Sequence, residues 1–163
     1  MAKRPVVAVI MGSDSDLAVM GEAAKILDSN GVAYRLKILS AHRSPDDTAS
    51  FTKAARAKGF KVIIAGAGGA AHLAGVIASH TTLPVIGVPM ETRELKGIDS
   101  LFSTVQMPSG VPVATMSIGK SGARNAAILA MQILSLSDKR IEKQISKFKK
   151  GLVAAVRAKN RKL

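Results

Sequence analysis

The chain has 163 residues, 47% of them hydrophobic, which is enough for one domain with a sizeable core. It contains no cysteine, which excludes disulfides and thiolate sites and is typical of a reducing compartment, so we expect a cytoplasmic protein. The formal net charge is +13, but ten of the 24 basic residues lie between Lys139 and Leu163, where Glu142 is the only acid. No apolar run approaches membrane-spanning length, so no membrane partner is expected.

Short runs of β-branched residues alternate with helical patterns along the chain, which is typical of βαβ units around a buried parallel sheet. The five predicted strands are Val6–Ile10, Arg35–Leu39, Val62–Ala65, Val85–Val88 and Val113–Met116. Because crossovers between parallel strands are right-handed, helices are expected on both faces of the sheet. The sequence therefore predicts one α/β domain over residues 1–163, a three-layer α/β/α sandwich around a flavodoxin-like or Rossmann-like parallel five-stranded sheet.

Helical patterns lie between and after these strands. The first predicted helix ends at Gly31, and a later one runs from about Ala123 to Leu134. From about residue 138 the pattern predicts a basic amphipathic helix and tail. The apolar positions of the first helix are Leu17, Met20, Ala24 and Leu27, and those of the last are Ile141, Ile145, Phe148 and Leu152. The stripe on the last helix is expected either to fold back onto its own domain or to pack on a neighbouring subunit.

Ser40–Asp46 follows the second predicted strand and contains an imidazole beside a guanidinium. Ser44 and Pro45 are typical of a helix start, so His42 and Arg43 are expected at the carboxyl end of the strand, where ligands bind in open α/β sheets. An imidazole exchanges protons near neutral pH, whereas a guanidinium can only hold an anion. His42 and Arg43 are therefore candidate functional residues, with a solvated loop as the alternative.

Met11–Asp16 follows the first predicted strand and offers hydroxyls and free backbone amides at a helix start, which suit a phosphate group. Asp16 is also suited to accept hydrogen bonds from ribose hydroxyls. The alternative is structural, because Ser13 or Asp14 would make a good N-cap. The pattern alone supports both interpretations.

Gly66–Gly75 follows the third predicted strand and consists largely of glycine and alanine around His72, so its backbone can approach a ligand closely. It fits a loose G-x-G-x-x-A pattern, but the dinucleotide fingerprint belongs after the first strand and is discounted here. His72 is suited either to donate to a ligand or to order the loop.

The chemistry offered by these loops is narrow. His42 and His72 lack the clustered carboxylates or close histidine spacing of a metal site, and His80 lies in a turn, so no metal is expected. No set of nucleophile, base and orienting residue stands out. These residues favour a phosphorylated sugar substrate whose reaction needs one proton shuttle and a small closed pocket.

Six sequence motifs that together resemble a known family extend along nearly the whole chain. They are Met11-Gly12-Ser13-x-Ser15-Asp16, Ser40-Ala41-His42-Arg43-x-Pro45-Asp46, the segment Ile63–Leu73, Leu83-Pro84-Val85-x-Gly87-Val88-Pro89, Asp99-Ser100-Leu101, and Val105-Gln106-Met107-Pro108-x-Gly110-x-Pro112-Val113. In this order they resemble the class I N5-carboxyaminoimidazole ribonucleotide mutases of purine biosynthesis, which are related to the aminoimidazole ribonucleotide carboxylases. Leu17 departs from the usual tryptophan of that family, and Ala74 from the usual proline.

The resemblance implies a reaction without cofactor, in which the carboxylate on the exocyclic nitrogen of an aminoimidazole ribonucleotide moves to ring carbon C4 through carbon dioxide. His42 matches the family's catalytic histidine, which would protonate the carbamate nitrogen and later remove the C4 proton. An aminoimidazole ribonucleotide carboxylase that uses free carbon dioxide is the alternative. The family also implies a homo-octamer.

The same match assigns the remaining site residues. The residues expected to bind substrate are Ser13, Ser15, Asp16, Ser40, Ala41, Arg43, Gly68, Gly69, Ala70, His72 and Leu73. Arg43 is expected to pair with the phosphate and Asp16 to hold the ribose hydroxyls. The glycine-rich loop would form the wall against the base and the migrating carboxylate.

Three other classes fit less well. Nucleic-acid binding suits the charge, but aromatic residues make up only 3% of the chain and leave few stacking platforms, so no nucleic acid is expected. A flavin protein would need aromatic side chains around the ring, and the only tyrosine, Tyr34, is expected in a strand. A phosphorelay receiver needs an aspartate after the third strand, where this chain has Gly66.

Overall fold

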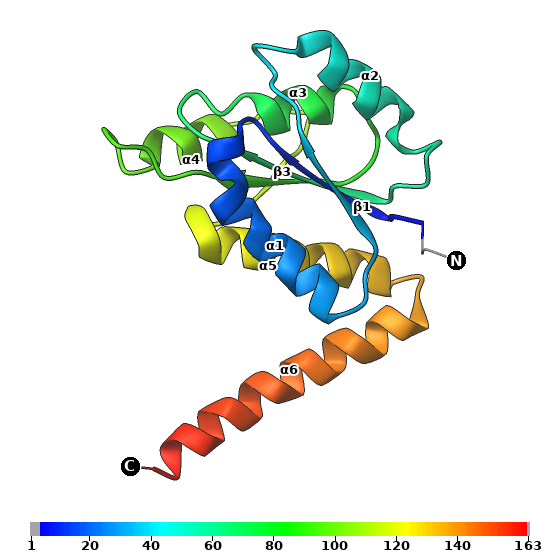
Figure 1. The fold of residues 1–163 in the computed structure, drawn as a ribbon, viewed down its shortest axis with the longest axis vertical. Coiled ribbons are helices and arrows are strands. Elements are labelled where there is room, and N and C mark those ends of the chain that lie inside the picture. Colours follow the sequence, from blue (N-terminus) through cyan, green and yellow to red (C-terminus); the bar gives the residue numbers. More distant parts are fainter. Residues whose placement is uncertain (1–3, 163) are drawn as a thin grey trace.

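The computed structural model describes residues 4–162, whose centre is a parallel five-stranded sheet (Figure 1). Its strands are β1 (Val7–Met11), β2 (Tyr34–Ile38), β3 (Val62–Ala67), β4 (Val85–Pro89) and β5 (Ala114–Thr115). They lie in the order β2-β1-β3-β4-β5, which is the flavodoxin-like order and confirms the predicted fold class. β5 is shorter than the predicted Val113–Met116, because only Ala114 and Thr115 pair with β4 at this edge of the sheet.

Helices cover both faces of the sheet and give the predicted three layers (Figure 1). They are the 3-10 helix η1 (Asp14–Asp16) and the α-helices α1 (Leu17–Ser29), α2 (Pro45–Ala55), α3 (Leu73–Ser79), α4 (Ile98–Val105), α5 (Gly119–Ser135) and α6 (Lys139–Asn160). α1 and α5 pack on one face, while α2 and α3 pack on the other.

The interior strand β1 shows why the interior strands appear in the sequence as continuous apolar runs. Val7, Val9 and Met11 are fully buried among residues of α1 and α5. Ala8 and Ile10 are fully buried on the opposite face, among residues of α2 and α3. Since both faces of a parallel sheet are covered, every position along such a strand has to be apolar.

Glu22 joins the two helices of one outer layer. Its carboxylate accepts hydrogen bonds from Lys25 on the same helix at 2.6 Å and from the Nε of Arg124 on α5 at 2.8 Å. These hydrogen bonds from Lys25 and Arg124 lower the pKa of Glu22 to about 2. The carboxylate is therefore charged throughout the neutral range and links α1 to α5.

Two helices differ from their predicted form. α5 begins at Gly119 rather than near Ala123, and its backbone at Gly122 passes so close to the carbonyl of Ser117 that a side chain there would clash. α4 is not among the helices predicted from the sequence, in which Asp99–Leu101 appears only as a motif. It has eight residues and its start carries no side-chain cap, so Asp99 in the first turn is its main start signal in the sequence.

The two halves of α6 have different surroundings. Ile141 is buried against the core and Ile145 packs beside it, so the beginning of the helix folds back onto its own domain. The remainder extends away from the sandwich (Figure 1), and Leu152 and Val156 are 53% and 59% exposed. Among residues 4–162, no helix combines the length and the apolar character needed to cross a lipid bilayer.

Candidate functional site

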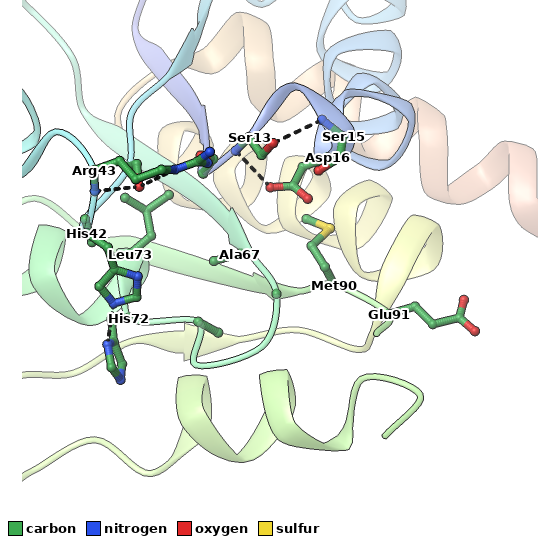
Figure 2. Close-up of a pocket in the computed structure, with 15 residues that line it drawn as sticks. Ser13, Ser15, Asp16, His42, Arg43, Ala67, His72, Leu73, Met90 and Glu91 are labelled. Carbon is green, nitrogen blue, oxygen red and sulfur yellow. Dashed lines mark hydrogen bonds between the residues drawn. The ribbon is translucent and has the colours of Figure 1, made fainter. Parts of the chain in front are cut away.

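A cavity of about 360 Å³ opens where the loops after β1, β2, β3 and β4 meet at the carboxyl edge of the sheet (Figure 2). The topology explains this place, because the chain leaves β1 towards β2 on one side and reaches β3 on the other, which makes a switch point. Ten predicted site residues line the cavity: Ser13, Ser15, Asp16, Ser40, Ala41, His42, Arg43, Gly68, His72 and Leu73.

The loop after β1 is held by its own residues. The Ser13 hydroxyl accepts a hydrogen bond from the backbone N–H of Ser15 at 3.4 Å, and the Asp16 carboxylate accepts one from the backbone N–H of Ser13 at 3.2 Å. This reciprocal arrangement is a capping box, so the structural interpretation of Ser13 is confirmed. Burial raises the pKa of Asp16, although the N–H of Ser13 acts in the opposite direction. Both side chains still reach the cavity.

Arg43 ties the loop after β2 to the loop after β1. Its Nη2 donates to the carbonyl of Gly12 at 2.8 Å, and its Nε donates to the hydroxyl of Ser40 at 3.4 Å. These contacts fix the direction of the guanidinium, whose remaining N–H groups are available to an anion in the cavity. The start of α2 at Pro45, with Ser44 as its N-cap residue, is confirmed.

The loop after β3 is held by a distant helix. The N–H of Gly69 donates to the hydroxyl of Ser100 at 3.0 Å, and the hydroxyl of Ser103 donates to the carbonyl of Ala70. Both serines belong to α4, and Ser100 is fully buried. Gly69 and Ala70 therefore contact α4 and are not among the residues that line the cavity, in contrast to their neighbour Gly68.

Two histidines from different loops face one another at one side of the cavity (Figure 2). The Nε2 of His42 lies 2.7 Å from the Nδ1 of His72, which is a hydrogen-bonding distance. The two rings are nearly perpendicular, with an interplanar angle of 82° and centroids 4.9 Å apart. Nothing in the sequence places these side chains in contact, since they are 30 residues apart.

Five lining residues were not named individually as substrate-binding residues, namely Gly12, Ala67, Ala71, Met90 and Glu91. The first three lie in predicted site loops, whereas Met90 and Glu91 were missed altogether. Met90 is buried beneath the cavity, and Glu91 lies at its rim with the carboxylate directed away from the other labelled side chains (Figure 2). Both follow β4, so the rule that ligands bind at the carboxyl ends of strands would have indicated them. Within residues 4–162, no three His, Asp or Glu side chains gather in a way that could hold a metal ion.

The cavity therefore combines a paired imidazole, one guanidinium, a half-buried carboxyl group, hydroxyls and a wall of small residues. This set can hold an anion and ribose hydroxyls and can move one proton. Fold and site together define a flavodoxin-like α/β protein with a small-molecule site at the switch point between β1 and β3.

Comparison with known proteins gives the family. A sequence model of the family described as AIR carboxylase matches residues 6–154, and the chain belongs to this family. The N5-carboxyaminoimidazole ribonucleotide mutase of Pyrococcus horikoshii is 51% identical over 99% of this chain and 90% of its own length. The protein of the same name from Bacillus subtilis is 56% identical over 87% of this chain and 88% of its own. These relatives confirm the resemblance expected from the motifs.

The fold agrees with a solved structure of similar size. The crystal structure of Treponema denticola PurE superimposes with a TM-score of 0.89 and 30% sequence identity, and the match covers 98% of this chain and 99% of that one. The match extends over nearly the whole of both chains, so the two proteins share one overall fold.

Proposed function

We propose that the chain is an N5-carboxyaminoimidazole ribonucleotide mutase of purine biosynthesis. The bond between the exocyclic nitrogen and the carboxylate breaks and releases carbon dioxide, while protonated His42 gives its proton to that nitrogen. Ring carbon C4 then attacks the carbon dioxide, and His42 takes the proton that C4 loses. Atoms and charge balance, His42 returns to its starting state, and the reaction requires no cofactor.

One observation carries this proposal. His42, which can exchange a proton, and Arg43, which can hold an anion, lie together on a cavity with a small-residue wall at the switch point of the sheet. This is the equipment that an internal carboxylate transfer on a ribonucleotide needs. The names of relatives that are 51% and 56% identical over most of the chain support the same reaction.

The roles of the other lining residues are assigned from the parts of the substrate, which are a phosphate, a ribose and a base. Arg43 pairs with the phosphate, while Asp16 and the hydroxyls of its loop hold the ribose. Gly68 and Leu73 form the wall against the base and the migrating carboxylate. A tight wall matters because released carbon dioxide has to stay beside C4 until the new bond forms.

A second candidate function is the carboxylation of aminoimidazole ribonucleotide by free carbon dioxide. The description of the matching family as AIR carboxylase favours it. In that reaction His42 would only remove the C4 proton, and no carbamate nitrogen would need protonation. The two candidates therefore differ in the first half of the reaction and share the second.

Replacement of His42 by asparagine tests the proposal. The purified wild-type chain should isomerise the N5-carboxylated substrate without added metal or nucleotide, and His42→Asn should lower kcat by roughly 100- to 10,000-fold, the usual contribution of general acid–base catalysis. His42 is exposed, so the melting temperature should not change. His80→Asn is the matched control, because His80 lies outside the cavity.

Each other outcome has a clear meaning. Wild-type turnover with aminoimidazole ribonucleotide and carbon dioxide alone would make the protein a carboxylase. Full activity of His42→Asn would remove this residue from the reaction, and the absence of turnover with either substrate would overturn the proposed function.

We also propose a cytoplasmic homo-octamer in which residues 1–163 of each subunit fold as one domain. Exposed apolar side chains on α4 and on the outer half of α6 support assembly. Contact with a neighbouring subunit would remove this apolar surface from water. The mass of the full chain in solution should be that of an octamer, and Leu152→Asp with Val156→Asp should reduce it. A monomeric wild type would contradict the assembly.

A further inference from the structure

His72 stands at the beginning of α3, but its side chain does not serve the helix. It is the N-cap residue and makes no side-chain capping hydrogen bond. Its ring instead turns to another loop, where its Nδ1 lies 2.7 Å from the Nε2 of His42. The contact is therefore an arrangement between two site loops and not a by-product of helix capping.

The backbone that carries this ring is firmly held. Ala71 and Leu73, on either side of His72, are each only 2% exposed. The carbonyl of His72 accepts a hydrogen bond from the N–H of Val76 at 2.9 Å. Two residues before His72, the carbonyl of Ala70 accepts a hydrogen bond from the hydroxyl of Ser103 on α4. An exposed ring on a fixed backbone is a suitable support for a second side chain.

The chemistry of imidazole limits what this contact can be. A hydrogen bond between two ring nitrogens requires one proton between them, because two N–H groups or two bare nitrogens would repel each other. The contact therefore occupies the Nε2 of His42. The other ring nitrogen of His42, Nδ1, is the one that stays available to a ligand in the cavity (Figure 2).

We propose that His72 is a positioning residue that fixes the ring of His42 and makes Nδ1 the atom that exchanges protons with the substrate. This inference rests on the proposed function. In it, the Nε2–H of His42 donates to the bare Nδ1 of a neutral His72 throughout the cycle. The Nδ1 of His42 carries the proton given to the exocyclic nitrogen, and after that transfer it is bare and takes the proton from C4.

Such an acceptor has two effects on His42. It selects the neutral form of the ring in which Nδ1 is bare, the form that can act as a base. It also stabilises the positively charged ring when Nδ1 is protonated, because the same hydrogen bond then comes from a charged donor. The general logic is that of a third group that orients a catalytic histidine.

Two replacements of His72 separate positioning from substrate contact. His72→Ala removes the acceptor and should lower kcat by roughly 10- to 100-fold, the cost of a misplaced catalytic group, with KM unchanged. His72→Asn places an amide oxygen near the position of Nδ1 and should restore most of kcat. His80→Ala, at the far end of the same helix, is the control and should have wild-type kinetics.

A measurement without turnover tests the same contact. In nitrogen-15 spectra of histidine-labelled full-length protein, neutral His42 should carry its proton on Nε2 in the wild type and in His72→Asn. In His72→Ala it should populate both neutral forms. This readout stands even if the wild type fails to turn over the mutase substrate, so failure of the proposed function and failure of the positioning role are distinguishable.

Several results would overturn the positioning role. His72→Asn as slow as His72→Ala would show that an acceptor at this point is not what matters. A raised KM with unchanged kcat would make His72 a substrate contact instead. A wild-type His42 with its neutral proton on Nδ1 would place the reactive nitrogen elsewhere.

Discussion

The loops after β1 and β3 face the same cavity but are held in different ways. The loop after β1 is stabilised by hydrogen bonds within itself. The Asp16 carboxylate accepts the backbone N–H of Ser13, and the two residues form a capping box. The loop after β3 depends on α4, because Gly69 bonds to Ser100, which is 31 residues further along the chain. One wall of the cavity is therefore local in origin and the other is set by the tertiary fold.

Among the residues that connect or support these loops, the largest expected effect concerns Arg43, which bridges the loop after β1 to the loop after β2. Arg43→Ala should raise KM roughly 10- to 100-fold, because a charge-assisted hydrogen bond to phosphate contributes about 1.5–3 kcal/mol. Steady-state kinetics with the mutase substrate would measure it. Stability should change by less than about 0.5 kcal/mol, since Arg43 is an exposed side chain.

Arg56→Ala is the matched control for Arg43. Arg56 is also exposed and also donates to a carbonyl, that of Thr82, but it lies outside the cavity. Its removal should leave KM at the wild-type value. An unchanged KM in Arg43→Ala, with normal stability, would remove the phosphate assignment.

The next largest effect is expected where α4 holds the loop after β3. Ser100→Ala leaves the N–H of Gly69 without its partner and should reduce the free energy of unfolding by about 1–3 kcal/mol. Ser103→Ala, one turn along the same face of α4, should cost less, because Ser103 is only half-buried and the carbonyl of Ala70 can turn to water. Urea unfolding of both variants would give the two values.

Activity should follow the same order. A loosened Gly69 frees the segment that carries His72, so kcat of Ser100→Ala should fall, while the local loop around Ser13 should be unaffected. Equal losses of stability in the two serine variants would mean that α4 does not hold the loop through Ser100.

This difference between the loops also explains how far the sequence could predict the site. His42, Arg43 and the Ser13 cap were predictable, because strand patterns and helix-start signals depend on neighbouring residues. The contact between His42 and His72 was not, since it requires the relative placement of two loops 30 residues apart. α4 was missed because eight residues without a capped start carry little local signal.

The residues after β4 were missed for another reason. The rule that placed His42 at the carboxyl edge applies equally to Met90 and Glu91, but neither belongs to a motif with recognisable chemistry. Gly69 and Ala70 show the converse. The family resemblance implied that both belong to the wall of the cavity, and only the tertiary fold reveals that these two positions contact α4.

The smallest effect compares one glycine from each loop. Gly69 has a φ of +66° and no neighbouring atom within 4 Å of an added Cβ, so Gly69→Ala should cost about 1–2 kcal/mol through backbone strain alone. At Gly12 an added Cβ would lie 3.8 Å from the Asp16 carboxylate, in ordinary contact, and no left-handed backbone is involved. Gly12→Ala should therefore change the free energy of unfolding by less than about 0.5 kcal/mol. Equal values from urea unfolding would show that the loop after β3 yields as easily as the loop after β1, and the support from α4 would then not fix its backbone.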